Sequence, residues 1–211
     1  MLRCRMRYLL LSSLLFLLVA CAKPIYSHLQ VVSTASSACL KKFQPDITSI
    51  VYKTNVDVVG KHLSGLLLFK RMPDSTLRAV FSSQMGLTFF DFVYTTKGFK
   101  VNYCIKQLNR KAVIRELQKI IALLLLHDRD PDKAEVLTDG ANLYYTCRHK
   151  KDIDYYLLDK NCEKLFKIEN ANTSQKKLIM DLTERKNGMP DSVYVAHQKF
   201  DFTISLKQLS K

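Results

Sequence analysis

Hydrophobic and polar residues alternate along much of residues 46–106, a pattern that predicts β-strands. Every odd-numbered position from Phe99 to Ile105 is apolar, and the positions between them hold lysine, asparagine and cysteine. Turn-forming residues such as Pro73 and Gly86 separate one such stretch from the next. Because the connectors are short, neighbouring strands should pair antiparallel. The expected strands span residues 48–58, 62–71, 75–84, 87–95 and 98–106.

Residues 110–126 show a different period and predict a helix, with Asn109 as its N-cap. Apolar side chains recur at helical spacing on one face, and the stretch from Ile120 to Leu126 is apolar almost all round. We therefore expect this helix to pack deeply against the concave side of the sheet. The polar run from His127 to Pro131 ends it.

Strand patterns resume after residue 141 and predict a second β-rich half. Residues 143–147 and 154–158 flank a polar turn and read as a hairpin. A short helix near residues 39–43 precedes the first half. The whole chain therefore predicts a mainly β fold with helix (α+β): a curved antiparallel sheet, or unclosed β-barrel, of about eleven strands covered by one long helix. The later strands are expected at residues 163–169, 176–182, 191–198 and 201–207.

Two expected strands, Leu66–Phe69 and Phe89–Tyr94, are apolar on both faces, whereas an antiparallel strand usually leaves one face to water. A curved sheet of this width can enclose a cavity. An ordinary filled core is the alternative interpretation of the same residues. The candidate ligand-binding residues that line the cavity are Leu67, Phe69, Phe81, Phe89, Val101, Tyr103, Ile105, Leu117 and Ile121.

The N-terminus has the pattern of an export signal. Arg3, Arg5 and Arg7 precede an uncharged apolar run from Tyr8 to Leu18. That run is shorter than the roughly 20 residues that a membrane-spanning helix needs. The pattern thus favours a signal peptide over a transmembrane helix.

The end of this segment, Leu18–Cys21, resembles a bacterial lipobox. The resemblance implies that the Cys21 thiol receives a lipid, that residues 1–20 are a signal peptide, and that two or three acyl chains anchor the protein stably. Residues 21–45 would then be the lipidated cysteine and a tether, and residues 46–211 the folded domain. Ala22 does not resemble an inner-membrane retention signal, which favours the outer membrane and a periplasm-facing protein.

Composition and charge narrow the class of protein further. Hydrophobic residues make up 47% of the chain, which excludes a disordered protein. The net charge is +14 and stays basic after Arg3, Arg5 and Arg7 are removed. A basic surface suits anionic lipid headgroups, although a generally basic soluble surface is the alternative. Nucleic acid is not expected as a partner because the protein is exported.

The cysteines and histidines predict neither a metal site nor a cofactor. Cys4 lies in the signal segment, and four further cysteines besides Cys21 allow three disulfide pairings or serve as small apolar side chains. The histidines are scattered without metal-ligand spacing, and no catalytic motif is present, so the protein is not expected to be an enzyme. These residues are Cys39, Cys104, Cys147 and Cys162, with His28, His62, His127, His149 and His197.

Asp91 stands between Phe90 and Phe92 in an apolar strand and needs a partner if it is buried. Arg78, on the neighbouring expected strand, is the candidate. The pair has two interpretations: a structural ion pair, or a polar contact at the mouth of the cavity.

Four segments together look like the opening strands of LolB-like lipoproteins: residues 59–61, 66–69, 77–81 and 85–91. The order of the strands with one helix resembles the LolA/LolB superfamily, here of a Bacteroidetes type. The resemblance implies an outer-membrane-anchored periplasmic lipoprotein that binds lipid, acyl chains or a lipoprotein in an apolar cavity, in lipid or lipoprotein trafficking. The chain departs from the family pattern in having no Trp. The alternative is a non-enzymatic structural or assembly lipoprotein with a filled core and a protein-binding surface.

Overall fold

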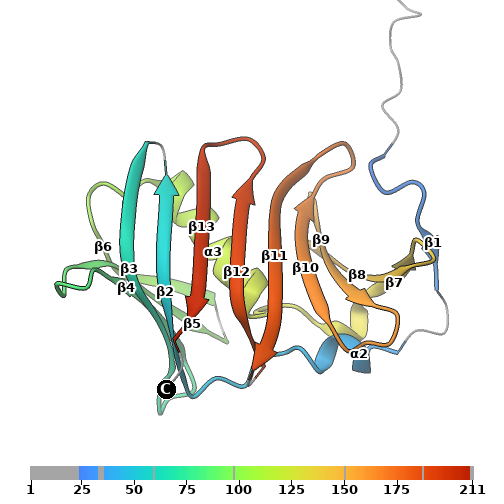
Figure 1. The fold of residues 1–211 in the computed structure, drawn as a ribbon, viewed down its shortest axis with the longest axis horizontal. Coiled ribbons are helices and arrows are strands. Elements are labelled where there is room, and N and C mark those ends of the chain that lie inside the picture. The colour runs from blue at the N-terminus through green and yellow to red at the C-terminus, as the bar shows by residue number, and fades with distance from the viewer. Residues whose placement is uncertain are drawn as a thin grey trace, which may run out of the picture.

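The computed structural model describes residues 24–32, 36–58, 60–96, 98–149, 151–186 and 188–209. The expected signal peptide and Cys21 lie outside the described residues. Within these ranges the chain forms a 13-stranded antiparallel sheet in the order β1-β7-β8-β9-β10-β11-β12-β13-β2-β3-β4-β5-β6. The two end strands, β1 and β6, are not paired with each other, so the sheet curves into an unclosed barrel (Figure 1). None of the helices in these ranges combines the length and apolar character needed to span a membrane.

The first half of the sheet confirms the strands expected from alternation. Each strand pairs antiparallel with the next, and the register is continuous from Ser49↔Lys70 to Val58↔Lys61 in the first hairpin. The strands are β2 (Ser49–Val58), β3 (Lys61–Arg71), β4 (Leu77–Ser82), β5 (Thr88–Thr95) and β6 (Gly98–Cys104).

The second half is a longer series of hairpins. Its last strand pairs with the first strand of the other half, from Phe202↔Val58 to Gln208↔Tyr52, and this pairing joins the halves into one sheet. The strands are β7 (Glu135–Thr138), β8 (Asn142–His149), β9 (Asp152–Asp159), β10 (Leu165–Ala171), β11 (Lys176–Lys186), β12 (Met189–His197) and β13 (Phe202–Gln208).

The expectation of about eleven strands and one helix was incomplete. The sheet gains β1 (Gln30–Val31) and β7, which pair with each other, and the chain adds the 3-10 turn η1 (Pro131–Lys133). The short helix expected near residues 39–43 is present as the one-turn helix α2 (Ala38–Lys41). β1 has only two residues and β7 only four. The sequences of such short strands cannot show a period of two. Their pairing depends on contacts with other parts of the fold.

The long helix α3 (Lys111–Leu124) crosses the concave side of the sheet, behind β2, β12 and β13 in Figure 1. Its N-cap is Arg110 and not Asn109, and Arg110 has extended backbone angles and makes no capping bond through its side chain. The expected apolar face is buried against the sheet, where Leu117, Ile120 and Leu124 are at most 3% exposed. This packing makes the helix part of the core.

Two apolar clusters stabilise the fold. The main one lies between α3 and the inner face of the sheet and includes fully buried Tyr52, Phe69 and Phe92. The second lies on the outer face, where Tyr144 and Tyr155 are covered by Ile25, Tyr26 and Leu29 of the N-terminal segment. Part of the segment expected as a tether therefore packs on the sheet.

One disulfide is present among the four described cysteines, and the other two remain free. Cys39 of α2 forms a disulfide with Cys162, which lies between β9 and β10. Cys104 and Cys147 are free. The bond ties the segment before β2 to the second half of the sheet.

Candidate functional site

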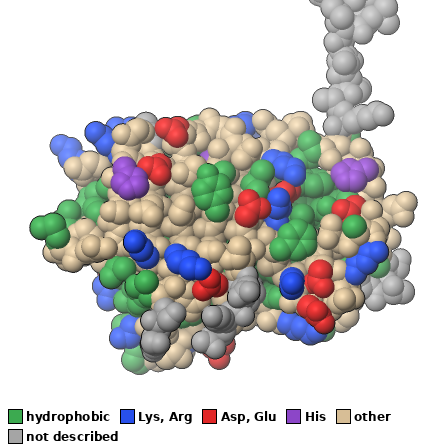
Figure 2. Space-filling view, viewed as in Figure 1, with side chains coloured by type: hydrophobic (Ala, Val, Ile, Leu, Met, Phe, Trp, Pro, Cys, Tyr) green, Lys and Arg blue, Asp and Glu red, His purple; other side chains and the backbone are tan. Residues whose placement is uncertain are grey.

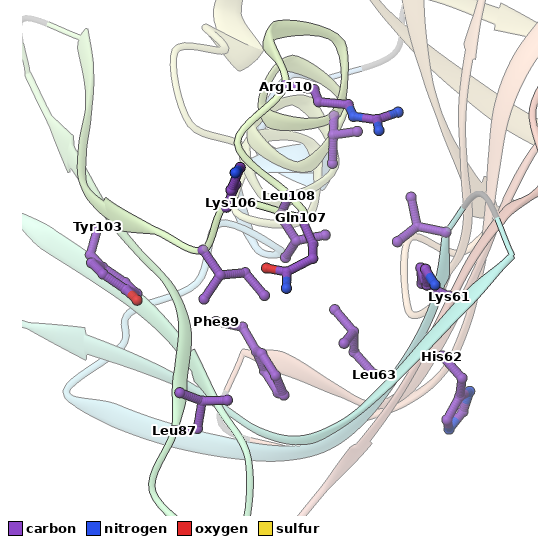
Figure 3. A pocket seen from close by; sticks show the side chains of 13 residues that line it. Lys61, His62, Leu63, Leu87, Phe89, Tyr103, Lys106, Gln107, Leu108 and Arg110 are labelled. Atoms are coloured by element: carbon purple, nitrogen blue, oxygen red, sulfur yellow. The ribbon is translucent and has the colours of Figure 1, made fainter.

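A cavity of about 700 Å³ opens at one end of the barrel, beside the start of α3 (Figure 3). It lies between the tip of the β2–β3 hairpin, the start of β5, the end of β6 and the loop that leads into α3. Its size is within the roughly 300–1,000 Å³ typical of ligand pockets. The lining residues are Val58, Lys61, His62, Leu63, Leu87, Phe89, Tyr103, Ile105, Lys106, Gln107, Leu108, Arg110 and Val113.

Apolar side chains from four different elements form the floor of this cavity. Val58, Phe89 and Leu108 are buried, whereas Leu63 and Ile105 are half-buried and reach the open space. Figure 3 shows Leu63 and Phe89 pointing toward the centre. A ligand that covers this floor would remove apolar surface from water, which favours binding by about 25 cal/mol per Å².

Cationic side chains lie around the same opening. Lys61, Lys106 and Arg110 are exposed, and within the described residues none of them forms an ion pair. The nearby His62 differs, because its Nδ1 lies 2.7 Å from a carboxylate oxygen of Asp57. No aspartate or glutamate lines the cavity. The rim is therefore positive and the floor apolar.

The space directly beneath α3 is filled. Only about 20 Å³ remains between the helix and strands β2, β3, β4, β5 and β13. Leu67, Phe69, Phe81, Leu117 and Ile121 all contact this small space, and none is more than 4% exposed. The interior that these residues line has room for about one water molecule.

The structure thus separates the candidate residues into two groups. Phe89, Tyr103 and Ile105 line the open cavity, and the five residues that contact the small space between α3 and the sheet line the filled interior. Val101 lines neither and packs half-buried against the core. Alternation predicts which face of a strand a residue occupies, but it carries no information on how far along the barrel the space stays open.

Sequence reasoning missed the cations at the rim. Lys61 lies at the tip of a hairpin, and Lys106 and Arg110 lie in the loop between β6 and α3. The signal was available in the expected topology, since in an antiparallel series the end of one strand, the start of the next and the end of the next but one share an end of the sheet. The end of β2, the start of β5 and the end of β6 meet there.

Asp91 has the partner expected for it. Arg78 Nε donates a hydrogen bond of 2.8 Å to Asp91 Oδ1, and the second guanidinium nitrogen contacts the other carboxylate oxygen. The hydrogen bond to Asp91 is the largest cause that raises the pKa of Arg78, and the negative charge of Asp91 raises this pKa further. Asp91 lies opposite Val80, on the outer face of the sheet, and does not line the cavity. This placement fits the structural interpretation of the pair.

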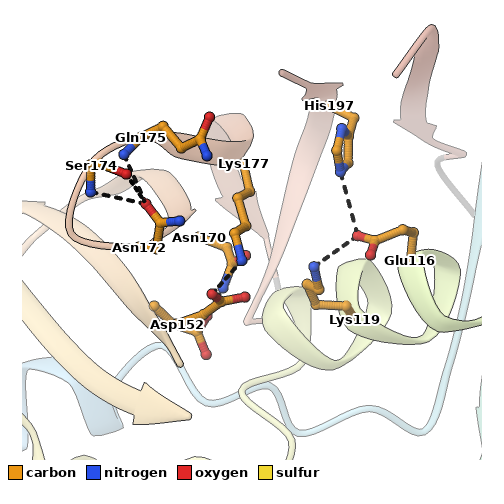
Figure 4. A network of polar contacts seen from close by, with 10 residues as sticks. Glu116, Lys119, Asp152, Asn170, Asn172, Ser174, Gln175, Lys177 and His197 are labelled. Atoms are coloured by element: carbon orange, nitrogen blue, oxygen red, sulfur yellow. Dashed lines mark hydrogen bonds and ion pairs between the residues drawn. The ribbon is translucent and has the colours of Figure 1, made fainter. Parts of the chain in front are cut away.

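A polar cluster holds α3 to the end of β12 (Figure 4). Lys119 donates a 2.8 Å hydrogen bond to Glu116, and His197 Nε2 lies 3.7 Å from the same carboxylate oxygen. The backbone N–H groups of Lys199 and Phe200 donate to His197 Nδ1. Burial, the largest effect, lowers the pKa of His197, whereas Glu116 acts in the opposite direction. The neutral imidazole is thus favoured in the folded protein.

Other reactive side chains do not gather into a further site. In the described ranges, His, Cys, Asp and Glu form no group of three that could hold a metal ion. Burial raises the pKa of the Cys147 thiol to about 11, so it is protonated at neutral pH and is a poor nucleophile.

No protein-family model matches the chain, and no curated protein matches its sequence. Among solved structures, the chain is similar to a DUF1329 family protein from Desulfovibrio piger, with a TM-score of 0.45 and 10% identity over 82% of this chain and 88% of that chain. It is also similar to a domain described as an outer membrane lipoprotein-sorting protein from Vibrio parahaemolyticus (TM-score 0.43, 8% identity, 82% of this chain and 90% of that one). A LolA superfamily protein from Nitrosomonas europaea gives a TM-score of 0.43 and 8% identity over 84% of this chain and 93% of that one.

Proposed function

We propose that this protein binds the apolar part of a lipid in the cavity at the open end of its barrel and catalyses no reaction on it. The single observation that supports this function most strongly is a cavity of about 700 Å³ whose floor is built from buried and half-buried apolar side chains. Each methylene group that enters such a floor contributes about 0.8 kcal/mol. An acyl chain is the ligand that makes most use of this surface.

The proposed setting is the periplasmic face of the outer membrane, with the protein anchored through a lipid on Cys21 and acting in lipid or lipoprotein trafficking. The support for the anchor is the Leu18–Cys21 pattern behind a basic and then apolar segment. We expect a Cys21→Ser variant to lose fatty-acid label in metabolic labelling and to leave the membrane fraction. Equal labelling of the variant and the wild type would contradict the anchor at this residue.

A second function has an observation of its own. The interior beneath α3 is nearly full, and the end strands β1 and β6 each have one neighbour only within the described sheet. Unpaired strand edges can accept a strand from another chain. An assembly lipoprotein that binds a protein partner through an edge would need no ligand cavity.

A fluorescent fatty-acid probe distinguishes the two functions. Val113 lines the cavity, whereas Val51 is also half-buried but lies on the outer face of β2. We expect the wild type and Val51→Phe to bind the probe and Val113→Phe to bind it at least tenfold more weakly. If the wild type binds no probe, the lipid-binding function is wrong and the assembly function takes its place.

A further inference from the structure

The rim of the cavity has a charge pattern that an apolar ligand does not explain. Lys61 lies on one side of the opening, and Lys106 and Arg110 lie near the start of α3 (Figure 3). All three are exposed, and none has an acidic partner within the described residues. Three cations around one opening repel each other, which costs free energy until an anion lies among them.

The start of α3 adds to this positive potential. No side chain caps its N-terminus, and its first turn contains no acidic residue. The positive end of the helix dipole is therefore not compensated locally, beside Arg110. The outer face of the sheet differs, because lysines and arginines there are interspersed with acidic residues (Figure 2). For example, Lys167 lies 3.1 Å from Asp181 and Arg78 pairs with Asp91.

We propose that the ligand of this cavity is an anionic amphiphile, a lipid with a phosphodiester head, whose chains cover the apolar floor while its head lies among Lys61, Lys106 and Arg110. This inference rests on the proposed lipid-binding function and names the class of lipid. A guanidinium such as that of Arg110 can bind two phosphate oxygens at once, and the lysines add point charges. An uncharged diacylglycerol group would leave all three cations without a partner.

The test uses four soluble probes with the purified full-length protein, after bound lipid has been removed. Dihexanoylphosphatidylglycerol is anionic, dihexanoylphosphatidylcholine is zwitterionic and dihexanoylglycerol is neutral, and all three carry the same chains. Glycerol 3-phosphate supplies the anionic head without chains. Calorimetric titration gives the affinity of each, at low and at high salt.

Two triple variants separate the rim from general surface charge. Lys61→Gln with Lys106→Gln and Arg110→Gln removes the rim cations. The control carries the same change in net charge at three exposed lysines that do not line the cavity, Lys53→Gln, Lys70→Gln and Lys160→Gln.

We expect the wild type and the control to bind the anionic lipid about tenfold more tightly than the zwitterionic or neutral lipid, with a preference that falls at high salt. The rim variant should bind all three lipids with the same affinity. Equal binding of the three lipids by the wild type would overturn the anionic head but leave the proposed function intact. Glycerol 3-phosphate binding as tightly as the lipid would also overturn the amphiphile. If no lipid binds at all, the proposed function fails with the inference.

Discussion

Among the glycines, Gly65 is the position at which an added side chain would meet the closest neighbour. A Cβ atom at this position would lie 2.0 Å from the backbone oxygen of Ser82, so β3 and β4 approach too closely there for any other residue. Because backbone atoms of a central sheet cannot move aside easily, we expect Gly65→Ala to lower the free energy of unfolding by about 3 kcal/mol. Urea unfolding measures this, with exposed Ser64→Ala as the control. A loss under 0.5 kcal/mol would show that the two strands are further apart.

His197 gives a second prediction at the scale of one residue. Burial lowers its pKa in the folded protein, with Lys119, Lys199 and Lys177 acting in the same direction and Glu116 against them. The unfolded chain, with a His pKa of about 6.5, therefore binds more protons below that pH than the folded chain does. The contribution of His197 to stability is present above pH 6.5 and is lost as the pH falls toward its folded pKa.

The measurement for His197 is the free energy of unfolding between pH 7 and pH 5. The wild type should lose stability over this range, and His197→Gln should lose less because it has no imidazole to protonate. Parallel profiles for the two proteins would contradict the assigned role. The same profile for an exposed histidine variant, His28→Gln, should follow the wild type.

At the scale of elements, the disulfide between Cys39 and Cys162 joins α2 to the turn between β9 and β10 over a sequence separation of 123 residues. Closing so long a loop restricts the unfolded chain strongly. We expect Cys39→Ser with Cys162→Ser to lower the free energy of unfolding by about 2–5 kcal/mol. Replacing the free, half-buried Cys104 by Ser is the control and should change it by much less. Equal losses in the two proteins would show that the bond adds little.

The elements also show what the sequence can predict. Strands such as β2 and β4 were predicted because each buries one face, so apolar residues recur at every second position. The predicted start of α3 was less accurate, because the N-cap is Arg110, which has extended backbone angles and makes no capping hydrogen bond through its side chain. The strands β1 and β7 could not be predicted, because their pairing depends on contacts between distant parts of the chain.

At the scale of the whole molecule, the candidate site also had a part that the sequence could predict and a part that it could not. Alternation along the strands placed Leu67 and Phe81 on the inner side, and helical spacing placed Leu117 there. The number and volume of such side chains fill that interior instead of lining a cavity. The open space lies at one end, where the β2–β3 turn and the loop before α3 meet. Which end stays open depends on how the side chains of several strands pack together, and no single segment carries that information.

The central claim is that lipid binds at this end of the barrel, and the absence of Trp from the chain permits a direct test. Tyr103 lines the cavity and is 47% exposed, and Tyr194 is 49% exposed on β12 away from it. The variants Tyr103→Trp and Tyr194→Trp each carry one Trp, whose fluorescence a brominated fatty acid quenches on contact. We predict saturable quenching in Tyr103→Trp and none in Tyr194→Trp. Equal quenching in both, or none in either, would contradict a lipid site in this cavity.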